Sequence, residues 1–365
     1  MTAFPLDKWI PPHVAALDGY HAAVPIASGP NVLKMDLNEC QAPPSPHVLA
    51  ALRAAVAQDA SLNWYPDSTC SALRGAIGRY LNVAADDVLV ANGSNMAMEL
   101  IARAFLTKDD SVLIVTPVYA VFSVQCKLQQ ARIESFPFSK PFAPDFNELL
   151  ATGGAHKLIY LANPNNPTGV GYPREHIRAL LGKRRDSLVV VDEAYVEYFG
   201  QSSVELIESH PNLIVLRSFS KAFSLAGMRC GYVVAQRPVL EVLGRTLAPW
   251  AVSGLTQVAA LAAMEDLPYM RETVAECGRA RKSIVDGLKE LGFVAYDTQA
   301  NFIIWQVREP GCAVKALAAQ NVHVSNKDSV PQMKGCLRVT VGNGAQSKLF
   351  LGIAQELCAK GLLEP

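Results

Sequence analysis

Several features that would narrow the class of this protein are missing from its sequence. Lysine plus arginine and aspartate plus glutamate balance at 33 residues each, so there is no positive excess for nucleic acid or an anionic membrane. No apolar run approaches the roughly 20 residues that a transmembrane helix needs. The seven histidines form no H-x-x-x-H pair or Cys/His cluster, which argues against a structural metal. We also find no low-complexity tract and no internal repeat.

The cysteines are present but are not paired in the sequence. All eight are scattered, without any C-x-x-C pair, and scattered thiols suit a reducing compartment better than a disulfide framework. The first eight residues have no basic stretch followed by an apolar one, which is the pattern of a signal peptide. We therefore expect a cytoplasmic protein, with neither a membrane nor nucleic acid among its partners.

What the chain does contain is a series of short β-branched apolar runs. Half of its 365 residues are hydrophobic, which suits a sizeable core and two lobes. Continuous apolar runs predict strands buried on both faces, and hence a largely parallel sheet covered by helices. One such helix is expected to begin at Ser45-Pro46, and another to bury Met98, Ile101 and Phe105. The apolar runs lie at residues 88–90, 112–115, 158–161, 188–191, 213–216 and 232–234.

The pattern changes after Trp250, which predicts a second domain. Phe350, Ile353 and Leu357 have helical spacing near the end of the chain. The fold class is therefore expected to be α/β, with a mostly parallel sheet in a large domain and a smaller α+β domain. We expect helices at residues 256–265 and 269–291 and strands at 301–305 and 337–341. The expected division is residues 1–44 as an N-terminal arm and part of the small domain, 45–250 as the large domain, and 251–365 as the small domain.

Polar or aromatic residues follow five of the predicted strands directly. In open α/β sheets, ligands bind outside the carboxyl ends of the strands, so these residues are expected to share one cleft. They are Asn92 to Ser94, Tyr119, Asn163 to Thr168, Asp192, and Ser218 to Lys221.

Lys221 is the most informative of these residues. It lies beside Ser218 and Ser220, with Arg229 eight residues later, and this set suits a cofactor that has both a carbonyl and a phosphate. The amine can form a Schiff base, while the hydroxyls and the guanidinium bind phosphate oxygens. Asp192, at the end of a buried strand, can pair with a protonated ring nitrogen. Together these residues predict a pyridoxal-phosphate site. Taken alone, such a lysine is usually a surface residue, and such an aspartate can be a helix N-cap.

A set of motifs spread over nearly the whole chain points the same way. The motifs are Asn38-Glu39, Tyr65-Pro66-Asp67, Asn92-Gly93-Ser94, residues 163–169, Asp192-Glu193-Ala194-Tyr195, Ser220-Lys221-Ala222-Phe223 and residues 337–342. As a set, they resemble the fold-type I pyridoxal-phosphate aminotransferases, most closely the histidinol-phosphate aminotransferase branch. The match is very specific for the family and less specific for the substrate.

The resemblance implies a role for individual residues. Lys221, Asp192 and Tyr195 would be catalytic, and Tyr195 and Asn166 would hydrogen-bond the cofactor's 3-hydroxyl. Tyr119 would stack on the cofactor ring. Without the resemblance, Asn166 could simply be a turn-forming residue of its loop, and Tyr119 could be an aromatic residue of the hydrophobic core. The other implied cofactor contacts are Ser94, Asn95, Ser218, Ser220, Arg229 and Tyr65, and the implied substrate contacts are Arg338, Tyr20, Asn38 and Ser325.

The resemblance also bears on assembly, because Tyr65 matches a tyrosine that reaches the phosphate in the neighbouring subunit. If this role carries over, the active unit is a homodimer with shared active sites. An ordinary aromatic residue beside a turn is the alternative for Tyr65. A loosely packed arm residue is likewise the alternative for Tyr20.

Two departures from the family pattern concern the substrate. Relatives usually have an acidic pair after the serine, where this chain has Asn95-Met96. A second arginine is expected thirteen residues before Arg338, and that position is Ser325. Two guanidinium forks suit a phosphate dianion, whereas one suits a carboxylate. We therefore expect a free α-amino acid rather than histidinol phosphate as the main substrate, with Lys327 as a candidate for the second charge.

The expected activity is transfer of an amino group from a free amino acid to a 2-oxo acid. Lys221 would act as a general base at Cα and then as an acid at C4′. The same scaffold also supports a lyase or cyclase that decarboxylates its substrate, or that eliminates from or cyclises a hydroxylated or arginine-like amino acid. The motifs do not distinguish these reactions, because they do not show which bond stands perpendicular to the ring. A non-catalytic binding protein is a third alternative, against which the intact Lys221 argues.

Overall fold

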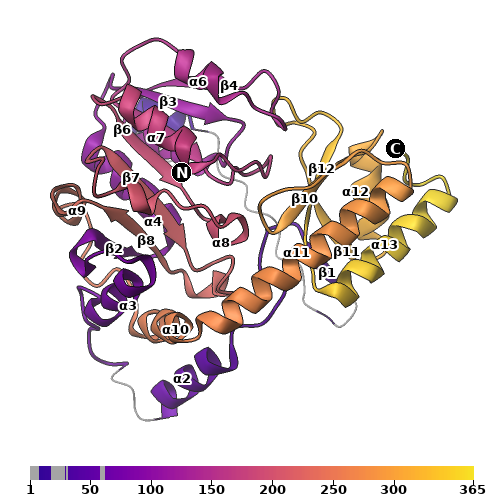
Figure 1. The fold of residues 1–365 in the computed structure, drawn as a ribbon, viewed down its shortest axis with the longest axis horizontal. Coiled ribbons are helices and arrows are strands. Elements are labelled where there is room, and N and C mark those ends of the chain that lie inside the picture. Colours follow the sequence, from indigo (N-terminus) through magenta and orange to yellow (C-terminus); the bar gives the residue numbers. More distant parts are fainter. Residues whose placement is uncertain (1–7, 18–28, 30–31, 58–61) are drawn as a thin grey trace, which may run out of the picture.

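The larger part of the molecule is built on a seven-stranded sheet (Figure 1). The computed structural model describes residues 8–17, 29, 32–57 and 62–365. The strand order is β2-β8-β7-β6-β5-β3-β4, in which β8 is antiparallel to both of its neighbours and every other pair is parallel. The strands are β2 (Val88–Ala91), β3 (Ser111–Thr116), β4 (Arg132–Pro137), β5 (Leu158–Ala162), β6 (Leu188–Asp192), β7 (Leu213–Ser218) and β8 (Gly231–Ala235).

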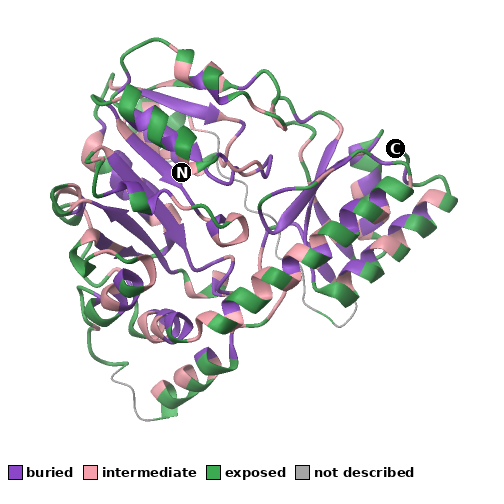
Figure 2. Cartoon of the chain, viewed as in Figure 1, coloured by how far each residue is buried: buried purple, intermediate pink, exposed green. Residues whose placement is uncertain are grey.

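The six strands predicted for this sheet are all present, and the sheet is largely parallel as expected. The central strands are buried on both faces, as their continuous apolar runs predicted (Figure 2). Strand β4 was not predicted. It lies at the edge of the sheet, and all of its residues are exposed or half-buried, so its sequence has no continuous apolar run.

Helices cover both faces of the large sheet. Alternate residues of a strand point to opposite faces, so Val190 packs in one hydrophobic core and Val191 in the other. The first core includes residues of α4 (Gly93–Phe105), α5 (Val121–Leu128) and α9 (Arg237–Gly244). The second includes residues of α2 (Pro46–Ala57), α3 (Ser71–Leu81), α6 (Phe146–Ala151), α7 (Arg174–Lys183) and α10 (Gly254–Glu265). Short helical segments lie at α1 (Pro12–Ala15), α8 (Val196–Phe199), η2 (Ala85–Asp87), η3 (Val204–Leu206) and η4 (Ala226–Met228).

The smaller part contains a five-stranded sheet in the order β1-β11-β12-β10-β9. β1 is parallel to β11, and the other pairs are antiparallel. The predicted strands β10 and β12 and the predicted helices α11 and α13 are present, whereas β1, β9, α12 and β11 were not among the expected elements. The elements are β1 (Leu33–Met35), α11 (Leu267–Glu290), β9 (Ala295–Tyr296), β10 (Phe302–Gln306), α12 (Pro310–Ala318), β11 (Val322–Asn326), β12 (Cys336–Thr340) and α13 (Gly344–Ala359).

Helix α11 extends from one part of the molecule to the other (Figure 1). Its Met270 belongs to the core of the large part, whereas Ile284 and Leu288 belong to that of the small part. The preceding helix, α10, packs against α2 and α3, and its Ala259 lies in the core of the large part. We therefore propose that the large domain continues through α10, beyond the expected boundary at residue 250. Within the described residues, no helix has the length and apolar character needed to span a membrane.

Candidate active site between the two sheets

The predicted site residues meet where the carboxyl edge of the large sheet faces the small sheet. Arg338 on β12 donates from Nη1 to Oδ1 of Asn166, in the loop after β5, at 2.7 Å. Asn38, just after β1, donates from Nδ2 to the Tyr195 hydroxyl at 3.0 Å. Tyr195 lies three residues beyond the end of β6. Both hydrogen bonds join the small sheet to loops of the large one.

Lys221 lies in this site with an amine that is easily deprotonated. Its Nζ donates to the carbonyl oxygen of Leu37 at 3.1 Å and lies 5.7 Å from the centre of the Tyr195 ring. Burial, together with the nearby positive charge of Arg338, lowers the pKa of Lys221 to about 8. The free amine, which a nucleophile or base must be, therefore becomes the main form near pH 8 instead of above pH 10.

Asp192 is held as a buried hydrogen-bond acceptor at the end of β6. Its Oδ2 accepts from the Tyr160 hydroxyl at 2.9 Å, and its Oδ1 accepts from the backbone N–H of Ala194 at 3.1 Å. Burial raises the pKa of Asp192 to about 6, while the Tyr160 hydrogen bond opposes this shift. A buried carboxylate gains most from a cationic partner, and a protonated ring nitrogen would be one. The sequence did not single out Tyr160, although a tyrosine within an aliphatic strand was a usable signal.

The start of α4 forms a cradle that suits a phosphate. Gly93 opens the helix with φ +82°, and a Cβ atom there would lie 2.6 Å from Nη2 of Arg229. Arg229 Nη1 in turn donates to Oγ of Ser220 at 3.4 Å, and the N–H of Ser220 donates to Oγ of Ser218 at 3.1 Å. Ser94 lies in the first turn of α4. A helix N-terminus, a guanidinium and serine hydroxyls are the donors that bind phosphate in proteins, so the residues fit pyridoxal phosphate.

The Tyr195 hydroxyl is fixed from two sides. It accepts a hydrogen bond from Asn38 and a longer one, at 3.4 Å, from Nδ2 of Asn166. Burial raises the pKa of Tyr195, so its hydroxyl keeps its proton near neutral pH. Asn38 is fully buried with φ +55°, and its N–H donates to Oγ1 of Thr340 at 2.9 Å. The structure therefore links Asn38 to Tyr195, and a contact between Asn38 and the substrate stays a prediction.

Two cationic side chains lie on one face of the small sheet. Ser325 on β11 pairs directly with Arg338 on β12, so their side chains share a face. Lys327 is two residues further along, and its N–H donates to the carbonyl oxygen of Cys336 at 2.9 Å, which continues the same pairing. Burial lowers the pKa of Lys327 to about 7, and the charge of Arg338 adds to this shift. Lys327 therefore lies on the side of Arg338, a direction that the sequence did not define.

The remaining predicted residues differ in how closely the structure connects them with this site. Tyr119 follows β3 and is half-buried, and Asn95 lies in the first turn of α4. Tyr65 is 78% exposed and stacks on Trp250, with ring centres 4.4 Å apart. Tyr20 lies outside the described residues. Among the residues that are described, no group of three or more His, Cys, Asp or Glu side chains could hold a metal ion.

Comparisons with known proteins agree with this geometry. Residues 30–351 match the family model of class I and II aminotransferases. A histidinol-phosphate aminotransferase of Ruminiclostridium cellulolyticum is 31% identical over 334 residues, which cover 90% of this chain and 93% of the relative. A dihydroxyacetone phosphate transaminase of Campylobacter jejuni is 34% identical over 341 residues, which cover 92% of each.

The fold also matches solved structures. The crystal structure of histidinol-phosphate aminotransferase from Sinorhizobium meliloti in complex with pyridoxal-5′-phosphate superposes with a TM-score of 0.86 at 23% identity, covering 98% of this chain and 99% of that one. At this identity the superposition supports the fold alone. The family model and the two sequence relatives go further, and by their extent this chain belongs to the class I and II aminotransferases.

Proposed function

We propose that this aminotransferase works with pyridoxal 5′-phosphate bound between Lys221, Asp192 and the start of α4. The observation that most supports this is that the Lys221 amine lies 5.7 Å from the centre of the Tyr195 ring and within reach of the charges of Asp192 and Arg229, which come from two separate segments of the chain. When bound, the cofactor supplies an aldehyde for the lysine amine and a ring that accepts electrons from the substrate.

The side chains of the chain would divide the remaining work. Lys221 takes the proton from Cα of the substrate and returns it at C4′, for which its lowered pKa suits it. Asp192, ionised above about pH 6, keeps the ring nitrogen protonated. Tyr195 and Asn166 hydrogen-bond the 3-hydroxyl, and Arg229 with its neighbouring serines binds the phosphate.

The substrate would be oriented by Arg338. Its guanidinium projects beside Asn166 and could hold the α-carboxylate of a free amino acid donor. Ser325 leaves the neighbouring position without a second guanidinium, so we propose that histidinol phosphate is not the main substrate. Lys327 supplies a weaker second charge on the same face, because burial leaves it only partly protonated near neutral pH. This charge suits a second anionic group on the donor or on its oxo-acid partner.

A substrate panel tests this proposal. The purified holoenzyme is given histidinol phosphate and aromatic, basic, acidic and hydroxylated amino acids, with and without 2-oxoglutarate, and products are identified by mass spectrometry. We expect product only with an oxo acid, together with glutamate, and the best donor to be a free amino acid. A high kcat/KM for histidinol phosphate would overturn the substrate part. Loss of water or carbon dioxide without any oxo acid would instead indicate a lyase or cyclase on the same scaffold.

We further propose that the active unit is a homodimer with shared sites. Tyr65 and Trp250 form a stacked aromatic pair on the surface of the single chain, and Trp64 beside them is 73% exposed. Exposed aromatic groups of this kind mark protein–protein interfaces. The resemblance gives Tyr65 a role at the phosphate of a neighbouring subunit, and its exposure here is compatible with that role.

A further inference from the structure

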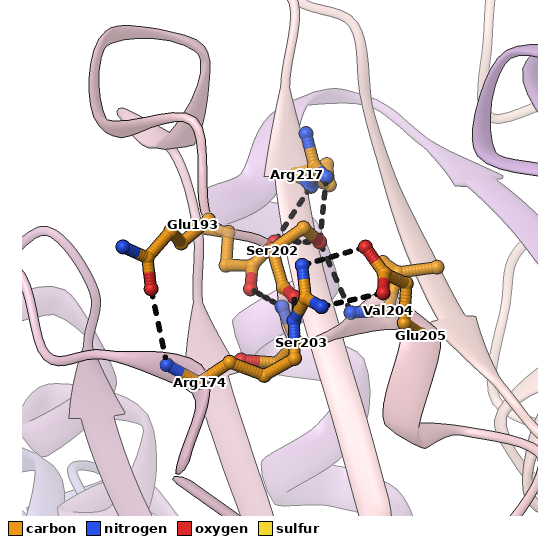
Figure 3. A network of polar contacts seen from close by, with 8 residues as sticks. Arg174, Glu193, Ser202, Ser203, Val204, Glu205 and Arg217 are labelled. Carbon is orange, nitrogen blue, oxygen red and sulfur yellow. Dashed lines mark hydrogen bonds and ion pairs between the residues drawn. The ribbon is translucent and has the colours of Figure 1, made fainter. Parts of the chain in front are cut away.

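A cluster of buried charges lies beside the turn that contains Asp192 (Figure 3). The Nε of Arg217 is 3.0 Å from Oε2 of Glu193, and its Nη1 donates to Oε1 of Glu197 at 2.9 Å. Its Nη2 donates to Oγ of Ser202 at 2.9 Å, and this hydroxyl donates to Oε2 of Glu193 at 2.8 Å. The three charged side chains are at most 3% exposed. None of them belongs to the site described above.

Each charged member of the cluster is close in sequence to a residue of the site. Glu193 follows Asp192, and Arg217 precedes Ser218. Glu197 lies on α8, two residues after Tyr195. The N–H of Glu193 also donates to the carbonyl oxygen next to Arg217, that of Leu216, at 2.8 Å. Arg217 therefore joins the ends of β6 and β7 on the face of the sheet opposite to Asp192.

The cluster contains more negative than positive charge. Two carboxylates share one guanidinium in a site without access to water, where an unbalanced charge is costly. Burial raises the pKa of Glu197, and the charge of Glu193 adds to this shift while Arg217 opposes it. After burial, the charge of Glu193 is among the causes that raise the pKa of Asp192. Among the described residues, the other titratable groups that interact with Asp192 or the cluster include Tyr80, Tyr160, Tyr195, Tyr198, Lys221 and Tyr232, with Tyr119 beside Tyr160 and Arg271 beside Tyr80.

We propose that Arg217 is a positioning residue for the reaction: it fixes the ends of β6 and β7 together and offsets the charge of Glu193, so that Asp192 faces the cofactor as a carboxylate. This inference rests on the proposed function, because it assigns Asp192 to the ring nitrogen. Arg217 itself touches neither substrate nor cofactor and acts through its neighbours.

The test compares two substitutions that should act in opposite directions. The dissociation constant of pyridoxal phosphate is measured against pH for the wild type, Arg217→Met and Glu193→Gln. Arg217→Met leaves the carboxylates without their counter-ion, so the pH below which binding weakens should rise by about one unit. Glu193→Gln removes the negative neighbour of Asp192 and should lower that pH. The cofactor's own titration is common to all variants and cancels in the comparison.

Three further variants separate electrostatics from folding. The double variant Arg217→Met/Glu193→Gln should lie between the single ones, and Arg217→Lys, which keeps the charge, should restore the wild-type midpoint. Arg174→Met is the matched control. Arg174 Nε donates to the carbonyl oxygen of Ser202 at 2.7 Å, but its guanidinium pairs with the exposed Glu205 at the outer end of the network (Figure 3). The Arg174→Met variant should have a lower melting temperature but the same pH midpoint for cofactor binding as the wild type.

The outcomes are distinct. Shifts of both single variants in the same direction, or no shift in either, would overturn the positioning role. If Arg217→Met does not fold, Glu193→Gln alone still tests the proposal. A lower pH midpoint for cofactor binding supports it, and an unchanged or higher midpoint overturns it. If the wild type fails to bind pyridoxal phosphate at all, the proposed function itself is wrong and the inference falls with it.

Discussion

At the scale of single residues, burial changes the two central ionisable groups of the site in opposite senses. It lowers the pKa of Lys221 to about 8 and raises that of Asp192 to about 6, because in each case it disfavours the charged form. Between these values, Asp192 is mostly ionised and Lys221 is in part a neutral amine. The proposed reaction needs both side chains deprotonated, a state whose population grows toward the upper end of this range, near pH 8.

Substitution of Lys221 tests its covalent role. Lys221→Ala should abolish the visible absorption that develops when pyridoxal phosphate is added, and with it turnover, because no other amine takes its place at the aldehyde. Lys327→Ala is the matched control. It removes a half-buried lysine of the same site and should leave the absorption intact. Multiple turnovers by Lys221→Ala would contradict the assignment.

Substitution of Asp192 should make the cofactor-free protein more stable. The pKa of Asp192 rises from 3.8 to about 6 on folding, so its proton is lost from the unfolded chain first. Its contribution to stability is therefore present below pH 3.8 and is lost as pH rises through 6, a difference of at most about 3 kcal/mol. Asp192→Asn does not titrate. Urea unfolding at pH 8 should show a gain of roughly 1–3 kcal/mol that shrinks toward pH 4.

The same Asp192→Asn variant should bind pyridoxal phosphate more weakly, because a neutral amide does not hold a protonated ring nitrogen. The difference in unfolding free energy between Asp192→Asn and the wild type should be larger at pH 8 than at pH 4. An equal difference at both pH values would mean that burial does not raise the pKa of Asp192. A site residue that reduces stability while it serves function is a common compromise in enzymes.

At the scale of elements, the start of α4 should be intolerant of any side chain at Gly93. Gly93→Ala would place Cβ 2.6 Å from Nη2 of Arg229 and would strain a backbone with φ +82°. We expect the affinity for pyridoxal phosphate to fall about tenfold or more, because Arg229 must leave the phosphate cradle.

A second glycine substitution provides the control for Gly93. A Cβ at Gly182, inside α7, would meet no atom within 4 Å. Gly182→Ala should therefore leave cofactor binding unchanged and raise stability by roughly 0.5–1 kcal/mol. Equal effects of the two substitutions on affinity, measured by fluorescence titration, would count against a phosphate site at this helix.

The elements that could be predicted from the sequence are those with an uninterrupted apolar pattern. The central strands are buried on both faces and so are apolar at every position, whereas the edge strand β4 contains Arg132 and Glu134 and shows no such run. The site residues at strand ends could be predicted because they directly follow these apolar runs. The contact of Asn38 with Tyr195 and the direction of Lys327 depend on cross-strand register and on the packing of the two sheets, which hydrophobic patterns do not determine.

At the scale of the whole molecule, the site requires both sheets and a continuous link between them. The carbonyl oxygen of Gly169, in the loop after β5, accepts a hydrogen bond from the N–H of Gln299 at 2.8 Å, and a Cβ at Gly169 would clash with the side chain of Thr298. This close approach lies near Asn166, which contacts Arg338. The packing of the two parts therefore helps to set where the substrate-binding arginine lies relative to the cofactor site.

Sharing of sites between two copies of the chain gives the last prediction. Lys221→Ala and Tyr65→Ala should each be nearly inactive alone, since one lacks the covalent lysine and the other the tyrosine proposed to reach the partner's phosphate. If the two variants are unfolded, mixed and refolded, roughly half of the dimers should be mixed with one intact site each, restoring about a quarter of wild-type activity. Activity equal to the sum of the parents, in a mixture shown by sedimentation to be dimeric, would show that Tyr65 does not act in the site of the partner subunit. If Tyr65 does reach the partner, Trp250→Ala should weaken the dimer, because it removes the ring on which the exposed ring of Tyr65 stacks. Lys221 should keep its covalent role in this variant.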